Sequence, residues 1–368
     1  MIRVLHVLGG LGTGGTESLI MNWYRNIDRT KIQFDFLVRS PDNNYLEEIT
    51  KLGGRVFYTA SFPRHFFRNF LETRKILKRK EWDVIHVHGN AAMYMLPLRL
   101  AKKLGYTNRI MHSHSIKAQN KVFLRIHNMN KMKLPTLATQ CLACSAAAGK
   151  WMFADHAFSL SQNAIDVDSY RFDSEVRTKI RKGLGIENKF VVGHVGRFAV
   201  PKNHEFLLNV FAEMKRDCPE SILMLIGDGE FETAIKTKAK QLGVADSVLF
   251  MGRRSNVGEL MSAMDMFVLP SLYEGLGIVL VEAQCNGLPC VVSQEAYNEE
   301  VNVYPDRVSV LPLSRGAEAW ADHILSKSSI EVNRNVDLDI LQDRGYDMKA
   351  EIKKLEELYL QAEKGYLL

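Results

Sequence analysis

The stretch MFVLPSLYEGLGIVLVEA, residues 266–283, predicts a buried strand, a tight turn and a helix in direct succession. Residues 266–269 form a short apolar run, which is typical of a strand in a parallel sheet. Gly275 and Gly277 allow the chain to turn sharply after it and to approach a ligand closely. This strand–turn–helix unit indicates an α/β fold with a site at the carboxyl end of a strand.

Two carboxylates belong to this unit. Glu274 lies in the turn, and Glu282 lies about two turns into the helix. Glu274 and the backbone N–H groups of Leu276 and Gly277 can face one ligand from the start of the helix. A carboxylate here suits sugar or ribose hydroxyls better than phosphate, because two anions repel each other. The alternative is a pair of surface glutamates, which is common by chance at this spacing.

Short apolar runs alternate with helical stretches along the whole chain. The expected strands are residues 2–8, 34–38, 56–59, 84–87 and 109–112, followed by 190–195, 222–226, 248–251, 266–269 and 290–293. Helices between successive strands imply right-handed crossovers and parallel sheets. The sequence becomes polar near residues 160–171, so we expect two domains of Rossmann-like α/β architecture.

The expected domains are residues 1–165 and 166–345. Residues 346–368 follow the last clear strand and carry apolar residues at helical spacing, so we expect a terminal helix that packs back on the first domain.

The composition is that of a globular protein. The chain has 368 residues, 46% of them hydrophobic, and five cysteines. No apolar run approaches the ~18–20 residues of a transmembrane helix, and the first residues do not resemble a signal peptide. Sparse, odd-numbered cysteines favour a reducing compartment over a disulfide scaffold. We therefore expect a cytoplasmic protein.

The two halves differ in charge. Residues 1–165 contain 24 Lys and Arg against 10 Asp and Glu, and residues 166–368 contain 24 against 32. The first half has a net charge of +14, which indicates an anionic partner such as a nucleic acid, a lipid surface or a phosphorylated substrate. A basic surface that serves only solubility is the alternative.

A glycine cluster follows the first expected strand and contains G-x-G-x-x-G at Gly10, Gly12 and Gly15. Glycines before a helix let the backbone approach a phosphate. A dinucleotide fold would also need an acidic residue at the end of the second strand, where this chain has Arg39. Arg39 could suit a 2′-phosphate, so an NADP-dependent oxidoreductase is the alternative function.

Arg197 and Lys202 follow the strand 190–195 and precede a helix. The planar fork of Arg197 and the point charge of Lys202 can converge on a diphosphate across the turn. Alone this pair is a weak signal, since cations near turns are usually surface residues.

Taken together, these segments resemble glycosyltransferase family 4, whose fold is GT-B, and within it the bacterial exopolysaccharide and capsule enzymes. The resemblance runs along essentially the whole chain. It is carried by the following segments: VLHVLGGLGTGGTESLIMNWYRNID, HSHS, CSAAAGKWMF, NAIDVDSYRF, GHVGRFAVPKNHEFLL, IGDGE and PSLYEGLGIVLVEAQCNGLPCVVS.

The resemblance implies a role for each matching residue. Arg197 and Lys202 would bind the diphosphate, Glu274 the donor sugar and Glu282 the ribose hydroxyls. The other residues that the resemblance places near the donor are Gly14, Gly15, Arg253, Leu276 and Gly277. A family histidine matches His112, at the end of a strand, or alternatively His114.

The implied fold is GT-B, two Rossmann-like domains with parallel sheets that face each other across a cleft. The resemblance makes residues 1–165 the acceptor domain and residues 166–345 the nucleotide-sugar donor domain. The implied activity is a retaining hexosyl transfer from a nucleotide sugar, UDP-linked by resemblance only, to a glycan or lipid-linked acceptor. Fixed cations and helix N-termini would stabilise the leaving diphosphate, so neither a metal nor another cofactor is expected.

The basic residues 64–80, with interleaved phenylalanines, suggest peripheral contact with an anionic membrane on its inner face. A solvated basic helix is the alternative. No nucleic-acid partner is expected, because the chain has no recognisable reading helix or aromatic platform.

Overall fold

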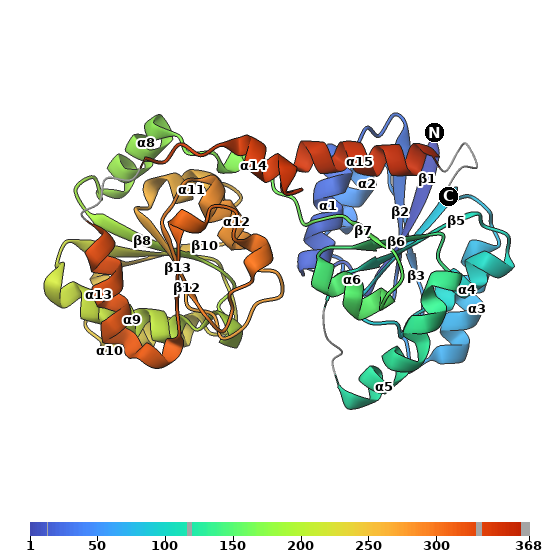
Figure 1. Cartoon of the computed structure of the whole chain (residues 1–368), viewed down its shortest axis with the longest axis horizontal. Helices are drawn as coiled ribbons and strands as arrows, with labels where there is room; N and C mark the ends of the chain where they lie inside the picture. The colour runs from blue at the N-terminus through green and yellow to red at the C-terminus, as the bar shows by residue number, and fades with distance from the viewer. Residues whose placement is uncertain (13, 116–119, 329–332, 362–368) are drawn as a thin grey trace. The chain divides into compact units, whose positions relative to one another are not determined.

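The computed structural model describes residues 1–12, 14–115, 120–328 and 333–361, which form two compact units. The amino-terminal unit comprises Met1–Ala164 and the segment that begins at Met348. The carboxyl-terminal unit is Ile165–Asp347. Each is an α/β unit built on a parallel sheet (Figure 1).

The sheet of the amino-terminal unit has seven strands among the described residues, in the order β3-β2-β1-β4-β5-β6-β7. They are β1 (Ile2–Val7), β2 (Ile32–Val38), β3 (Val56–Tyr58), β4 (Val84–Gly89), β5 (Asn108–Ser113), β6 (Gln140–Ala143) and β7 (Ser159–Leu160). Its helices are α1 (Gly15–Asn26), α2 (Leu46–Lys51), α3 (Phe66–Leu77), α4 (Leu96–Lys103), α5 (Lys121–Asn130), α6 (Ala146–Phe153) and α15 (Met348–Gln361), with a 3-10 turn at Lys131–Thr136.

Both faces of this sheet are covered by apolar side chains. Alternation along β1 places Val4 in the cluster that contains Trp23 of α1 and Tyr359 of α15, whereas Leu5 joins the opposite cluster, which contains Leu77 of α3. Helix α15 therefore completes the core of the amino-terminal unit, although it follows the other unit in sequence.

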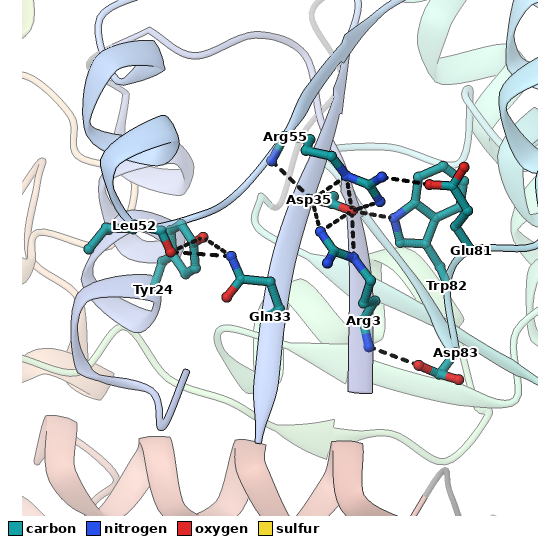
Figure 2. A network of polar contacts seen from close by, with 9 residues as sticks. All are labelled: Arg3, Tyr24, Gln33, Asp35, Leu52, Arg55, Glu81, Trp82 and Asp83. Atoms are coloured by element: carbon teal, nitrogen blue, oxygen red, sulfur yellow. Dashed lines mark hydrogen bonds and ion pairs between the residues drawn. The ribbon is translucent and has the colours of Figure 1, made fainter. Parts of the chain in front are cut away.

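A buried carboxylate links three parts of the amino-terminal unit (Figure 2). Asp35 of β2 is fully buried and accepts hydrogen bonds from the guanidinium groups of Arg3 and Arg55 and from the indole N–H of Trp82. Burial alone would raise the pKa of Asp35, but these donors hold it below its usual range. Asp35 is thus a structural anchor in the middle of β2.

The carboxyl-terminal sheet has six strands among the described residues, in the order β10-β9-β8-β11-β12-β13. They are β8 (Phe190–Val195), β9 (Ser221–Ile226), β10 (Val248–Gly252), β11 (Met266–Leu269), β12 (Cys290–Ser293) and β13 (Val308–Leu311). Its helices are α7 (Val167–Tyr170), α8 (Ser174–Leu184), α9 (His204–Asp217), α10 (Glu232–Gln241), α11 (Val257–Ala263), α12 (Ile278–Cys285), α13 (Gly316–Ser328) and α14 (Leu338–Asp343).

The boundaries of the units lie one to two residues from the expected ones. Ile165 belongs to the carboxyl-terminal unit because its N–H donates to the carbonyl of Tyr346 at 2.9 Å and both side chains join that unit's core. Residues 346 and 347 therefore belong with the carboxyl-terminal unit, and α15 begins at Met348. Within the part of the chain that is described, no helix is both long and apolar enough to span a bilayer.

Candidate functional site

The carboxyl-terminal unit gathers polar side chains where its strand order reverses. β8 pairs with β11 on one side and with β9 on the other, and all three are parallel, so their carboxyl ends meet at one edge of the sheet. Lys202 follows β8, and Glu274 follows β11. This position is the usual ligand site of open α/β sheets.

Lys202 and Glu274 are in direct contact. The Lys202 Nζ atom lies 2.7 Å from Glu274 Oε1, and the Ser271 hydroxyl donates to the same oxygen at 2.6 Å. The two loops are also joined through the backbone, since the Leu272 N–H donates to the carbonyl of Pro201 at 2.8 Å. The side chains of Lys202 and Glu274 are 19% and 12% exposed, so this charge pair is largely buried but still in contact with solvent.

Two glycines shape the loops around this pair. A Cβ added at Gly196 would lie 3.0 Å from Cδ and Cε of Lys202, so the lysine stem packs on bare backbone. Gly277 caps α12 in the left-handed region with φ +79°, a conformation that side chains disfavour. The sequence prediction of a sharp turn before α12 is confirmed here.

Arg197 and Arg253 are more exposed. Arg197 lies after β8 and pairs with Glu230 at 3.0 Å, and its side chain is 67% exposed. Arg253 follows β10 and is exposed. Both stand at the carboxyl edge of the sheet, where a bound anion would meet them.

Glu282 is half-buried and lies about one turn into α12, rather than the two turns expected, because the helix begins only at Ile278. Burial raises its pKa to about 7, although a hydrogen bond from the Tyr170 hydroxyl and the charge of Lys202 act in the opposite direction. Glu282 therefore changes protonation state near neutral pH. Tyr170 ends α7, a helix that packs against α12.

In the amino-terminal unit, the glycine loop after β1 leads directly into α1. Gly14 is the N-cap of α1 and Gly15 its first residue, and both are exposed. A Cβ added at Gly14 would lie 2.5 Å from Glu17 Oε2, so the Glu17 carboxylate folds over the first turn. Burial raises the pKa of Glu17.

The two candidate histidines have different environments. His112 lies inside β5, is fully buried and stacks on Trp23 with ring centroids 5.7 Å apart. His114 follows the carboxyl end of β5 and is half-buried. The sequence favours His112 because it lies at the end of the strand. The structure buries His112 within the sheet, and His114 is the more exposed of the two.

His114 belongs to a chain of buried imidazoles. His6 Nδ1 lies 2.9 Å from His88 Nε2, and His88 Nδ1 lies 2.9 Å from His114 Nε2. Burial lowers the pKa of His6 and of His114 to about 3, so these rings are neutral at physiological pH. Within the described ranges, the groups with metal-ligand spacing are His6–His86–His88 and His88–His112–His114, and neither includes a residue of the Lys202–Glu274 site.

Sequence reasoning missed three partners of the site residues: Ser271, Tyr170 and Glu230. Ser271 lies between Pro270 and Glu274 in the quoted stretch, so its proximity to the turn could have pointed to it. Tyr170 and Glu230 come from other loops, and only the fold brings them to Glu282 and Arg197.

Comparison with known families assigns each unit. The family described as Glycosyltransferase Family 4 matches residues 13–159, and that described as Glycosyl transferases group 1 matches residues 176–328. These ranges fall within the amino-terminal and the carboxyl-terminal unit, respectively.

Individual proteins show the same likeness. The chain is 34% identical to the Bacillus subtilis (strain 168) protein named as glycosyltransferase EpsF, over 97% of this chain and 96% of that protein. It is 25% identical to the Escherichia coli UDP-Gal:alpha-D-GlcNAc-diphosphoundecaprenol alpha-1,3-galactosyltransferase, over 71% and 72% of the two chains. Anabaena HepE, solved in complex with UDP, has a TM-score of 0.70 at 19% identity and is covered to 98% by 99% of this chain.

The paired parallel-sheet units and these likenesses define a glycosyltransferase of the GT-B fold. The chain belongs to glycosyltransferase family 4. The comparisons give no support to the alternative of an NADP-dependent oxidoreductase, and the second strand of the amino-terminal sheet uses its acidic residue, Asp35, in the buried network of Figure 2.

Proposed function

We propose that the protein transfers a hexose from a nucleoside diphosphate sugar, with UDP as the nucleotide, to a glycan or lipid-linked acceptor in exopolysaccharide or capsule synthesis, with retention of anomeric configuration. The observation that carries the proposal is the Lys202–Glu274 contact at the switch point of the carboxyl-terminal sheet. The solved relative HepE binds UDP, and the E. coli relative is named for a UDP-galactose donor, which supports this nucleotide.

The positively charged residues of the site would stabilise the leaving diphosphate. Breaking the sugar–phosphate bond leaves a diphosphate that gains negative charge, and fixed positive groups lower that barrier. Lys202 and Arg197 supply these charges, and the turn just before α12 adds the backbone N–H donors of Leu276 and of Gly277, the N-cap of that helix. We propose that these groups do this work without a metal ion.

The two carboxylates would bind hydroxyl groups. Glu274 stands next to Lys202 and would hold the transferred sugar beside the diphosphate. Glu282, about one turn into α12, would hold the ribose hydroxyls. A front-face, leaving-group-assisted reaction fits this division, and trapping of a glycosyl–enzyme adduct would contradict it.

A panel of thermal unfolding measurements tests the donor site. UDP, GDP, ADP and NADPH are added separately to the purified protein without added metal. A ligand at 100 times its Kd stabilises by about 2.7 kcal/mol, which is readily measured. We expect UDP to stabilise the wild type and to lose this effect in Lys202→Ala and Arg197→Ala. Stabilisation by NADPH alone would overturn the proposal.

We also propose that the amino-terminal unit contacts an anionic membrane. In α3, Phe66, Phe67 and Leu71 are exposed, Phe67 by 80%, whereas Phe62 and Phe70 pack against the core. Helix α5 and the turn after it expose a second apolar set: Val122, Leu124, Ile126, Met129 and Met132. Basic side chains surround both sets, which is the composition of interfacial helices.

Vesicle flotation tests the membrane proposal. We expect binding to vesicles rich in anionic lipid at low salt, loss of binding at high salt, and weaker binding in Phe67→Ser and Met129→Ser. The control is Val200→Ser, because Val200 is an exposed apolar residue of the other unit. Absence of binding at low salt would remove the proposal.

A further inference from the structure

The amino-terminal unit contains a pocket of about 820 Å³, which includes none of the residues of the Lys202–Glu274 site. It lies where β2, β3, β4 and β5 end: Arg39 follows β2, Phe62 follows β3, Gly89 ends β4 and Ser115 follows β5. Phe123 of α5 adds a wall. The carboxyl edge of a parallel sheet is the usual place for a ligand, so the location is that of a binding site.

Aromatic side chains and a guanidinium group line this pocket. Phe62, Tyr94 and Phe123 supply aromatic surface, which suits the apolar faces of sugar rings. The described residues that line it include one guanidinium, Arg39, and no carboxylate.

Arg39 is held without an anionic partner. Its guanidinium carbon lies 3.9 Å from the centroid of the Tyr94 ring, which fixes the side chain in place. Among the described residues, none forms an ion pair with Arg39, and its buried Nε–H has no hydrogen-bond acceptor. Burial also lowers the pKa of the guanidinium, so the pocket bears the cost of a poorly solvated cation.

The family resemblance assigns the acceptor to the amino-terminal domain. Within that domain, we infer that the acceptor saccharide occupies this pocket and that Arg39 selects an acidic group on it. A carboxylate or phosphate oxygen would accept from the guanidinium N–H groups of Arg39 that line the pocket and would compensate the guanidinium charge, while the aromatic residues contact the attached sugar ring. The inference rests on the proposed sugar transfer and adds to it a requirement: the acceptor carries a negative charge close to its recognised sugar.

Binding of small probes to the full-length protein tests this inference. The probes are glucuronic acid, α-glucose 1-phosphate and the neutral methyl α-glucoside, titrated by calorimetry or ligand-observed NMR with UDP present to fill the donor site. Glucuronic acid and glucose 1-phosphate distinguish a carboxylate from a phosphate as the recognised anion.

We expect at least one anionic probe to bind more tightly than methyl glucoside, and Arg39→Gln to weaken that probe about tenfold or more. Arg39→Lys should keep part of the preference, because it keeps the charge without the fork. Arg99→Gln removes a charge from the exposed side of α4, outside the pocket, and should change nothing. Melting temperatures show whether each variant is folded.

Three results would overturn the inference: equal binding of charged and neutral probes, an unchanged affinity in Arg39→Gln, or no binding by any probe. UDP affinity is measured in parallel. Normal UDP binding together with one of these three results would overturn the inference about Arg39, whereas loss of UDP binding would overturn the proposed function. Lys202→Ala should weaken UDP and leave the saccharide probes unaffected, whereas Arg39→Gln should do the reverse.

Discussion

The ammonium group of Lys202 lies 2.7 Å from the Glu274 carboxylate, and this pair joins the loops that follow β8 and β11. Each partner holds the other at the edge of the sheet, so each is placed before a donor arrives. A diphosphate would compete with the Glu274 carboxylate for the Lys202 ammonium group. A sugar would instead donate its hydroxyl groups to Glu274 and leave Lys202 available to the diphosphate. The two residues should therefore respond differently to UDP and to UDP-sugar.

We expect Lys202→Met to weaken UDP binding about tenfold or more, because a charged donor to the diphosphate is lost. Glu274→Gln removes the competing anion but keeps the side-chain shape, so UDP affinity should stay the same or increase. Turnover of the sugar nucleotide should still fall roughly 10²-fold in Glu274→Gln. Calorimetry with UDP and an assay of UDP release measure both quantities; weaker UDP binding in Glu274→Gln would contradict the assignment.

Gly196→Ala should impair donor binding while the protein stays folded. The added methyl would lie 3.0 Å from Cδ and Cε of Lys202, so the lysine stem must shift. A matched control is Gly183→Ala in α8, where nothing lies within 4 Å of the new Cβ. There the gain in helix propensity should stabilise the protein by about 0.5–1 kcal/mol without affecting UDP. UDP titration and thermal unfolding of both variants test the contrast, and unaltered UDP affinity in Gly196→Ala would refute it.

Glu282 should make stability and donor binding depend on pH in opposite senses. Its pKa is raised from 4.5 to about 7 in the folded protein, so the folded state binds this proton more tightly. The resulting stability is complete below pH 4.5 and is lost as pH rises through about 7. Glu282→Gln stays neutral, so its melting temperature should rise relative to that of the wild type between pH 5.5 and 8.5.

In the proposed donor site, the ionised Glu282 carboxylate would accept hydrogen bonds from the two ribose hydroxyls, so we expect UDP to bind the wild type more tightly as pH rises through about 7. Glu282→Gln should lose that pH dependence and bind UDP more weakly at pH 8. Calorimetry at several pH values measures the UDP affinity of the wild type and of Glu282→Gln. A parallel pH dependence of UDP affinity in wild type and variant would show that another group titrates.

The two candidate histidines can be separated by activity and stability. His114→Ala should lower turnover about tenfold or more and should lower the melting temperature less than His112→Ala does, since His114 is half-buried and its ring is hydrogen-bonded to His88. His112→Ala removes a ring that stacks on Trp23 in the core, so it should destabilise by roughly 1–3 kcal/mol. An assay of UDP-sugar turnover and denaturant unfolding of both variants test this; the reverse pattern would restore His112 as the ligand contact.

Much of the fold could be predicted from the sequence because the strands of both sheets are continuous apolar runs. The expected strand 190–195 coincides with β8, and the expected strand 266–269 coincides with β11. The short strands β6, β7 and β13 were not predicted. β7 has two exposed residues, so its sequence carries no apolar signal, and pairing with β6 alone defines it.

The candidate site was predictable to the extent that its residues lie in one strand–turn–helix unit. Glu274 and Gly277 satisfy that condition. The partner of Glu282 does not, because Tyr170 reaches it from α7, more than 100 residues earlier in the chain. The choice between His112 and His114 depends on how deeply each side chain is buried. The sequence does not reveal this, because the two residues are only two positions apart and both point to the same face of the sheet.

Asp35 provides the last prediction, on the stability of the amino-terminal unit. Asp35→Asn would leave the guanidinium groups of Arg3 and Arg55 without their shared anion, although both are partly exposed and can be hydrated. We expect a loss of roughly 1–3 kcal/mol in this unit. Asp83→Asn is the control from the same network, because Asp83 is exposed and accepts only from the backbone N–H of Arg3 in Figure 2.

The effect of pH identifies the mechanism. The pKa of Asp35 is lowered in the folded protein, so its contribution is present above the unfolded value near 3.8 and disappears as pH falls through the folded value. The difference in melting temperature between wild type and Asp35→Asn should therefore shrink below pH 4, while UDP binding by the other unit stays unchanged at neutral pH. A difference that persists undiminished into acid would show that Asp35 stabilises the sheet through packing rather than charge.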